Sequence, residues 1–249
     1  HPRIDLEFGR IEVEPLVGVA EPLTLRKFVI LRFVVAHTPG LAASTPKGCV
    51  VWEPPMRVIV LPAQQSSMRL FVSVDVDSLA NRIEDVQSPL LGLDGLKPID
   101  PTVAHATVKF LGEGDHDLNA LEDAIRRAVD EADVGSFEAT LEGVGAFPSS
   151  EYIRVVWLGF GAGTEQLQSL HQFVEAETTA IGYDEERHEF TPHVTLARME
   201  NAASKAAVKR FLDEADPEIG PFRVEELRLK ESVLASDGPT YHTVETFEL

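Results

Sequence analysis

Two short segments of the chain each carry a histidine and a threonine separated by one residue. His105 and Thr107 stand in V-A-H-A-T-V-K-F-L-G, and His193 and Thr195 stand in P-H-V-T-L-A-R. An imidazole has an unperturbed pKa of about 6.5, so one copy can be neutral while the other is protonated near neutral pH. Such a pair can supply a general base and a general acid to one reaction.

Both segments are predicted to be β-strands, because polar and apolar residues alternate in them with a period of two. A histidine and a threonine two residues apart then project from one face of a strand. The motif residues predicted on the opposite, core-facing side are Ala106, Val108, Val194 and Leu196. The same alternation puts Lys109 on the face of His105, where it could add positive charge; a solvated lysine at a strand end is the alternative.

A single H-x-T segment is weak evidence, since a lone histidine in a strand is usually structural. The other six histidines of the chain lack a threonine two positions later. Two copies in matching apolar settings therefore favour a functional pair. For Thr107 and Thr195 a purely structural role, as residues with high strand propensity, remains the alternative.

The composition is that of a globular chain. Its 249 residues are 44% hydrophobic, which is enough to bury a substantial core. The longest apolar run is too short to span a bilayer, and a single cysteine, Cys49, excludes an internal disulfide. We therefore predict a cytoplasmic protein with no membrane contact.

The balance of acidic and basic residues changes at Met68. Residues 1–67 hold 7 Lys and Arg against 6 Asp and Glu, whereas residues 68–249 hold 15 against 35, and the net charge is −19. The first segment also holds eight of the sixteen prolines. We predict an N-terminal extension of unknown role at 1–67, outside the native domain, with Met68 as a possible natural start. The scattered acidity of 68–249 suggests adaptation to concentrated salt, and an ordinary acidic protein is the alternative.

Within 68–249 the periodicity predicts an α+β fold in two halves, each with one histidine strand. The expected order is strand, helix, strand, helix, two strands, helix, strand, helix and three strands. Helices are expected over 78–87, 117–132, 164–181 and 202–214, and the closing strands over 222–229, 231–235 and 240–247.

Five stretches carry a resemblance to a known family. They are H-A-T-V-K-F-L-G-E, F-T-P-H-V-T-L-A-R, R-L-F-V-S-V-D-V, I-R-V-V-W-L-G-F and Y-H-T-V-E-T-F-E-L. Together they resemble the 2H phosphoesterases, and more narrowly the RNA 2′,3′-cyclic phosphodiesterases that were first called 2′-5′ RNA ligases. The resemblance runs from about Met68 to Leu249.

The resemblance implies a bilobal fold, in which two pseudo-symmetric lobes with antiparallel sheets line a central cleft and the helices lie outside. It also implies hydrolysis of RNA 2′,3′-cyclic phosphate ends to 2′-phosphomonoesters, with His105 as proton donor and His193 as proton acceptor. Strand spacing alone does not assign these two roles. Arg198 matches a family arginine that contacts the nucleotide, although simple alternation puts it on the opposite face.

The threonine hydroxyls could hold the phosphate oxygens. No cluster of carboxylates or cysteines accompanies the histidines, so we expect neither a metal ion nor another cofactor. The expected substrate is an RNA with a 2′,3′-cyclic phosphate end, or a small cyclic nucleotide, bound by a monomer. Two alternatives remain: 2′-5′ RNA ligation by the reverse chemistry, and a non-catalytic module that binds nucleotides or RNA ends.

Overall fold

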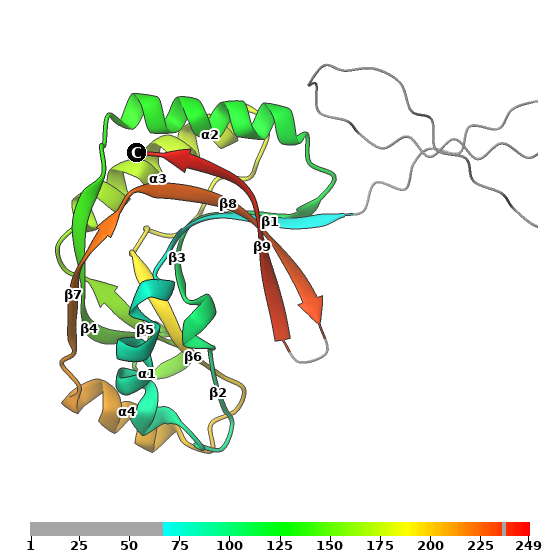
Figure 1. Ribbon diagram of the computed structural model, residues 1–249. Coiled ribbons are helices and arrows are strands. Elements are labelled where there is room, and N and C mark those ends of the chain that lie inside the picture. The colour runs from blue at the N-terminus through cyan, green and yellow to red at the C-terminus, as the bar shows by residue number, and fades with distance from the viewer. Residues whose placement is uncertain (1–66, 236–237) are drawn as a thin grey trace, which may run out of the picture. The chain divides into compact units, whose positions relative to one another are not determined.

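The computed structural model describes residues 67–235 and 238–249 (Figure 1). The predicted N-terminal extension, apart from Ser67, lies outside the described residues. In the described part of the chain, no helix is both long and apolar enough to cross a membrane.

The described residues contain four α-helices, three short 3-10 helices and nine strands. The helices are α1 Ala80–Gln87, α2 Leu118–Ala132, α3 Thr164–Ala180 and α4 Lys205–Glu214. The strands are β1 Met68–Asp75, β2 Leu96–Pro98, β3 His105–Gly114, β4 Phe137–Ser149, β5 Tyr152–Phe160, β6 His193–Met199, β7 Glu218–Val224, β8 Glu226–Ala235 and β9 Gly238–Glu248.

The strands form one antiparallel sheet in the order β7-β4-β5-β6-β3-β1-β8-β9, and β2 pairs with β6. Its two halves meet where β3 lies beside β6, and a single residue pair, Ala106 with Val194, joins these two strands. Each half thus contributes one histidine strand. The predicted α+β fold with antiparallel strands is confirmed, although the two expected sheets are joined into one.

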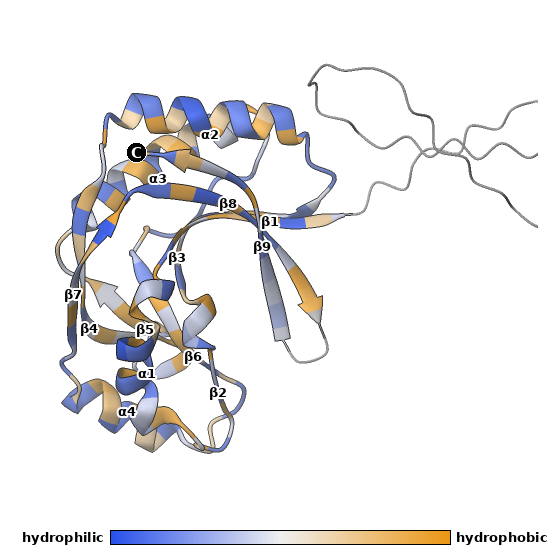
Figure 2. Ribbon diagram, in the orientation of Figure 1, coloured by the Kyte–Doolittle hydropathy of each residue, from blue (hydrophilic) through white to orange (hydrophobic). Residues whose placement is uncertain are grey.

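A separate hydrophobic core supports each half of the sheet. The first core packs α2 and α3 against β1, β3 and β8 and also takes in residues of β4 and β7. The second packs α1 and α4 against β5 and β6 and also takes in Ala106 of β3 (Figure 1). Polar and apolar residues alternate along α2 (Figure 2). Its buried residues recur at helical spacing: Leu121, Ala124, Ile125 and Ala128.

The predicted helices match the observed ones closely, but the closing strands were divided incorrectly. A strand over 222–229 and another over 231–235 were expected, whereas β7 ends at Val224 and β8 runs unbroken to Ala235. The short strand β2 was expected to be loop. Its three residues are ordered by pairing with β6, a partner about 100 residues away in the sequence.

Candidate active site

The two H-x-T motifs lie side by side in the middle of the sheet. Ala106 and Val194, the residues between each histidine and its threonine, are direct partners across β3 and β6. In an antiparallel pair this register sets His105 opposite Thr195 and His193 opposite Thr107. Two imidazoles and two hydroxyls from distant parts of the sequence therefore gather on one face of two adjacent strands.

Each imidazole is held by a backbone carbonyl two residues earlier in the chain. Nδ1 of His105 lies 2.9 Å from the oxygen of Val103, and Nδ1 of His193 lies 2.7 Å from the oxygen of Thr191. Because a carbonyl only accepts hydrogen bonds, Nδ1 must be the donor in both rings. The neutral form of each histidine then carries a free lone pair on Nε2, the atom available for proton transfer.

The pKa of both histidines is lowered from the ordinary value. For His105 burial is the main cause, Lys230 and Arg198 lower the pKa further, and the Val103 hydrogen bond and the charge of Asp75 oppose the shift. For His193 burial is again the main cause, and Arg198 adds to it against the Thr191 hydrogen bond. Both rings are therefore biased toward the neutral form before any anion binds.

An aromatic ring meets the edge or face of each imidazole. The ring centroid of Tyr241 lies 4.9 Å from that of His105, with an angle of 80° between the planes. Phe147 lies 4.9 Å from His193 at 79°. Edge contacts of this kind are favourable for aromatic rings, so the two halves of the sheet fix their histidines in equivalent ways.

A β-bulge in each motif strand changes which side chains share the histidine face. The register skips Val108 in β3 and Leu196 in β6, so one extra residue follows each threonine. As a result both Val108 and Lys109 are buried in β3, and both Leu196 and Ala197 are buried in β6. A bulge of one residue reverses the alternation beyond it.

The bulges decide the positions of the two remaining predicted site residues. Arg198 is exposed, and because the bulge reverses the alternation after Leu196, it projects from the same face as His193 and Thr195. Its charge lowers the pKa of His105 and of His193. Lys109 is turned the other way, and its side chain is 0% exposed. The prediction that Lys109 shares the face of His105 is therefore wrong.

Lys109 instead holds the chain segment that precedes the second motif. Its Nζ lies 2.5 Å from Oε2 of Glu175 and 2.7 Å from the carbonyl oxygen of Asp184. Oε1 of Glu175 accepts a 2.7 Å hydrogen bond from the backbone N–H of Glu186. Among the described residues, His171, Glu175 and Glu186 form the one group spaced to hold a metal ion, and the Lys109 ammonium already neutralises its central carboxylate.

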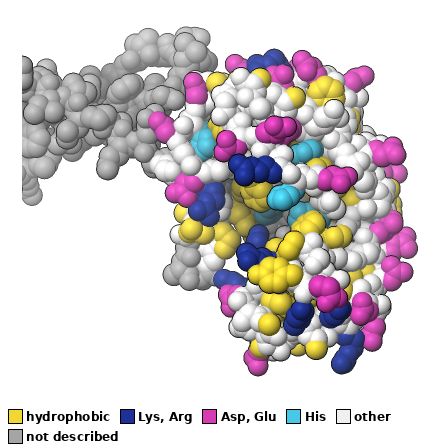
Figure 3. Space-filling model, turned by 180° about the vertical axis from the view of Figure 1, so that it is seen from behind, with side chains coloured by type: hydrophobic (Ala, Val, Ile, Leu, Met, Phe, Trp, Pro, Cys, Tyr) yellow, Lys and Arg dark blue, Asp and Glu magenta, His cyan; other side chains and the backbone are white. Residues whose placement is uncertain are grey.

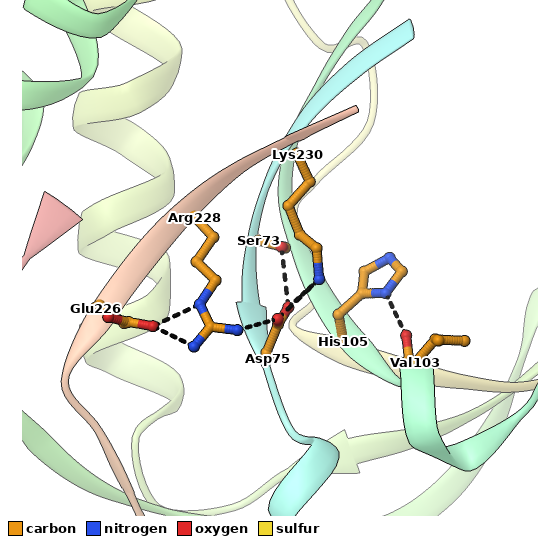
Figure 4. Close-up of polar contacts among 7 residues, drawn as sticks. All are labelled: Ser73, Asp75, Val103, His105, Glu226, Arg228 and Lys230. Atoms are coloured by element: carbon orange, nitrogen blue, oxygen red, sulfur yellow. Dashed lines mark hydrogen bonds and ion pairs between the residues drawn. The ribbon is translucent and has the colours of Figure 1, made fainter. Parts of the chain in front are cut away.

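A partly buried network of charged side chains lies beside His105, on β1 and β8 (Figure 4). Asp75, the partner of His105 across β1 and β3, accepts hydrogen bonds of 2.8 and 2.7 Å from Nζ of Lys230 and one of 2.6 Å from Arg228. Arg228 also contacts Glu226. Asp75, Lys230 and Tyr241 were missed as site residues, although Asp75 and Tyr241 lie in two of the family-like stretches.

A pocket of about 450 Å³ opens beside the histidine strands. Thr107 and His193 line it together with the aromatic side chains of Phe110, Phe147 and Phe190. Figure 3 shows which side chains lie on this face of the molecule. Histidine, Lys, Arg and apolar side chains gather in its middle, and Asp and Glu lie mainly around them. Although the domain is acidic overall, Lys and Arg side chains lie near its histidines.

Comparisons with known proteins agree with this geometry. The family described as the 2′-5′ RNA ligase superfamily matches residues 75–232. An RNA 2′,3′-cyclic phosphodiesterase of Aeropyrum pernix is 36% identical over 150 residues, which cover 60% of this chain and 84% of that protein. One of Archaeoglobus fulgidus is 34% identical over 185 residues, which cover 73% of this chain and 100% of that protein.

Solved structures share the fold. TT0787 of Thermus thermophilus has a TM-score of 0.59 at 27% identity, over 73% of this chain and 98% of that one. Apo LigT of E. coli has a TM-score of 0.58 at 24% identity, over 74% of this chain and 98% of that one, a likeness of fold alone. By sequence and by structure, this chain belongs to the 2′-5′ RNA ligase superfamily.

Proposed function

We propose that this protein hydrolyses RNA 2′,3′-cyclic phosphate ends to 2′-phosphomonoesters, using two histidines and no metal ion. One observation carries the proposal: the centres of the two H-x-T motifs pair directly across β3 and β6, and neither Nε2 makes a hydrogen bond within residues 67–235 and 238–249. The relatives named RNA 2′,3′-cyclic phosphodiesterase support the same reaction and substrate.

In the proposed reaction the two histidines act on opposite sides of one phosphorus atom. Nε2 of His193 takes a proton from water as the water oxygen attacks phosphorus. The bond from phosphorus to the ribose 3′ oxygen breaks, and that oxygen receives the proton that His105 carried. The 2′-phosphate remains on the sugar. This direction of proton transfer follows the family resemblance.

The lowered pKa of His193 suits its role as the base directly, whereas His105 suits its role as the acid after the substrate binds. A buried, neutral His193 can accept a proton at neutral pH. His105 must hold a proton before the reaction, and a phosphate anion beside it favours the charged imidazolium. Substrate binding would therefore favour the charged imidazolium that His105 needs in order to act as the acid.

Three further side chains would hold the phosphate. The hydroxyls of Thr107 and Thr195 are half-buried beside the imidazoles and can donate to the non-bridging oxygens. Arg198 supplies a planar cation close to both histidines, a group well suited to phosphate. Lys109 is left out of this set because its ammonium is buried against Glu175.

The test is hydrolysis of a 2′,3′-cyclic nucleotide in EDTA, followed by identification of the product. We expect a 2′-monophosphate and a rate that EDTA does not change. A 3′-monophosphate, or a rate that requires an added metal ion, would overturn the proposal. The same substrate offered with a 5′-hydroxyl RNA separates hydrolysis from ligation, because ligation would yield a 2′-5′ linked product in place of the monophosphate.

A further inference from the structure

Tyr241 lies next to His105 in a setting that holds its ring firmly. It stands on β9 opposite Ser232, where the β8–β9 hairpin extends past the end of its pairing with β1 (Figure 1). Its ring centroid lies 4.9 Å from His105 and 5.4 Å from Phe71. Nζ of Lys230 lies 5.9 Å from the same centroid. Contacts with two rings and a cation fix the orientation of the tyrosine.

In the other half of the sheet a phenylalanine makes the matching contact with the histidine. Phe147 meets His193 at the same distance and nearly the same angle as Tyr241 meets His105. A phenyl ring is therefore enough to support an imidazole in this geometry. The hydroxyl of Tyr241 is an addition that ring packing alone does not explain.

That hydroxyl has no partner in the described residues. It makes no hydrogen bond there, and Tyr241 as a whole is half-buried. Burial raises the pKa of Tyr241, and the charge of Arg198 lowers it in part. The phenol is thus a protonated donor within the electrostatic reach of Arg198, the cation whose charge also acts on both imidazoles.

We propose that Tyr241 is a further substrate-contacting residue, whose hydroxyl donates a hydrogen bond to a non-bridging phosphate oxygen on the His105 side. This inference rests on the proposed function, because it needs a phosphoryl group between the two histidines. No bond forms or breaks at Tyr241. The three donors Thr107, Thr195 and Tyr241 would then surround the phosphate together with Arg198.

The test compares Tyr241→Phe with wild type on a 2′,3′-cyclic nucleotide. This change removes one oxygen and keeps the ring that supports His105. We expect kcat/KM to fall about 10- to 100-fold, the factor expected for one hydrogen bond to a charged group. Tyr152→Phe is the matched control, because the Tyr152 hydroxyl contacts Arg154 at the exposed end of the β4–β5 hairpin, and it should keep the wild-type rate.

The affinity for inorganic phosphate, measured by calorimetric titration, gives a readout independent of turnover. Tyr241→Phe should weaken this binding, and the control should not. If Tyr241→Phe keeps both its rate and its phosphate affinity within about twofold of wild type while His105→Ala is inactive, the inference is wrong and the proposed function stands. If wild type itself fails to turn over, the proposed function fails, and the phosphate titration alone decides whether Tyr241 binds the anion.

Discussion

The buried ion pair of Lys109 and Glu175 gives a sharp test of how the site is held. The perturbation is Lys109→Met, which keeps most of the side-chain volume and removes the charge. The Lys109 side chain is 0% exposed and that of Glu175 is 17% exposed. After the change, the Glu175 carboxylate keeps the N–H of Glu186 but loses its counter-ion, and the Asp184 carbonyl loses its donor.

The size of the effect follows from this burial. Removing one partner of a buried pair costs about 3–5 kcal/mol, because the other charge is left uncompensated. Since some water reaches Glu175, we expect the lower end, about 3 kcal/mol. For a domain of this size, that corresponds to a fall in melting temperature of roughly 6–12 °C. The assay is urea unfolding followed by circular dichroism.

Two further variants decide whether the charge is the cause. Glu175→Gln in the Lys109→Met background removes the uncompensated charge and still accepts from Glu186, so the double variant should regain part of the lost stability. Lys209→Met, which removes a cation from an exposed pair with Glu151, should unfold like wild type. A loss below about 1 kcal/mol for Lys109→Met, or strictly additive effects in the double variant, would refute the reasoning.

Further predictions concern pH and substrate. Because burial and Arg198 lower the pKa of His105 and His193, kcat/KM, which reports the free enzyme, should peak on the acid side of about pH 6.5; a peak above about pH 7 would contradict this. Because both pKa values are lower in the folded than in the unfolded chain, the unfolded chain binds more protons as the pH falls below about 6.5. The free energy of unfolding should therefore decrease below that pH. It should decrease less in a His105→Asn, His193→Asn double variant. Arg198→Met should raise the pKa of both histidines and move the kcat/KM peak to higher pH, whereas Arg198→Lys should not; equal profiles would exclude Arg198 from the site. Finally, turnover should depend little on RNA length, because an acidic domain gains little from long polyanions, and a rate that climbs steadily with length would count against recognition of the cyclic end alone.

The sequence was most informative where a short-range pattern determines the structure. The period-two alternation identified both histidine strands and correctly put His105 and Thr107, and His193 and Thr195, on one face. The helical spacing of apolar residues likewise located α2 to within a residue at its start. These patterns depend only on neighbours along the chain.

The errors arose where one extra residue or a distant partner decides the outcome. Nothing in T-V-K-F or T-L-A-R marks the bulges that bury Lys109 and bring Arg198 to the histidines. A bulge is defined by the strand opposite, which sequence periodicity does not show. The contacts of Asp75 with Lys230 and of Tyr241 with His105 also join strands about 140–160 residues apart, which only the folded sheet brings together.

The most direct test of the central claim is the hydrolysis rate of a 2′,3′-cyclic nucleotide by wild type, His105→Ala, His193→Ala and the double variant. If the two imidazoles act as one acid–base unit on one phosphorus atom, each single variant should lose about 10²–10⁴-fold in kcat. The double variant should then be little worse than either single one. A single variant that keeps a rate within about threefold of wild type would remove that histidine from the reaction and contradict the account.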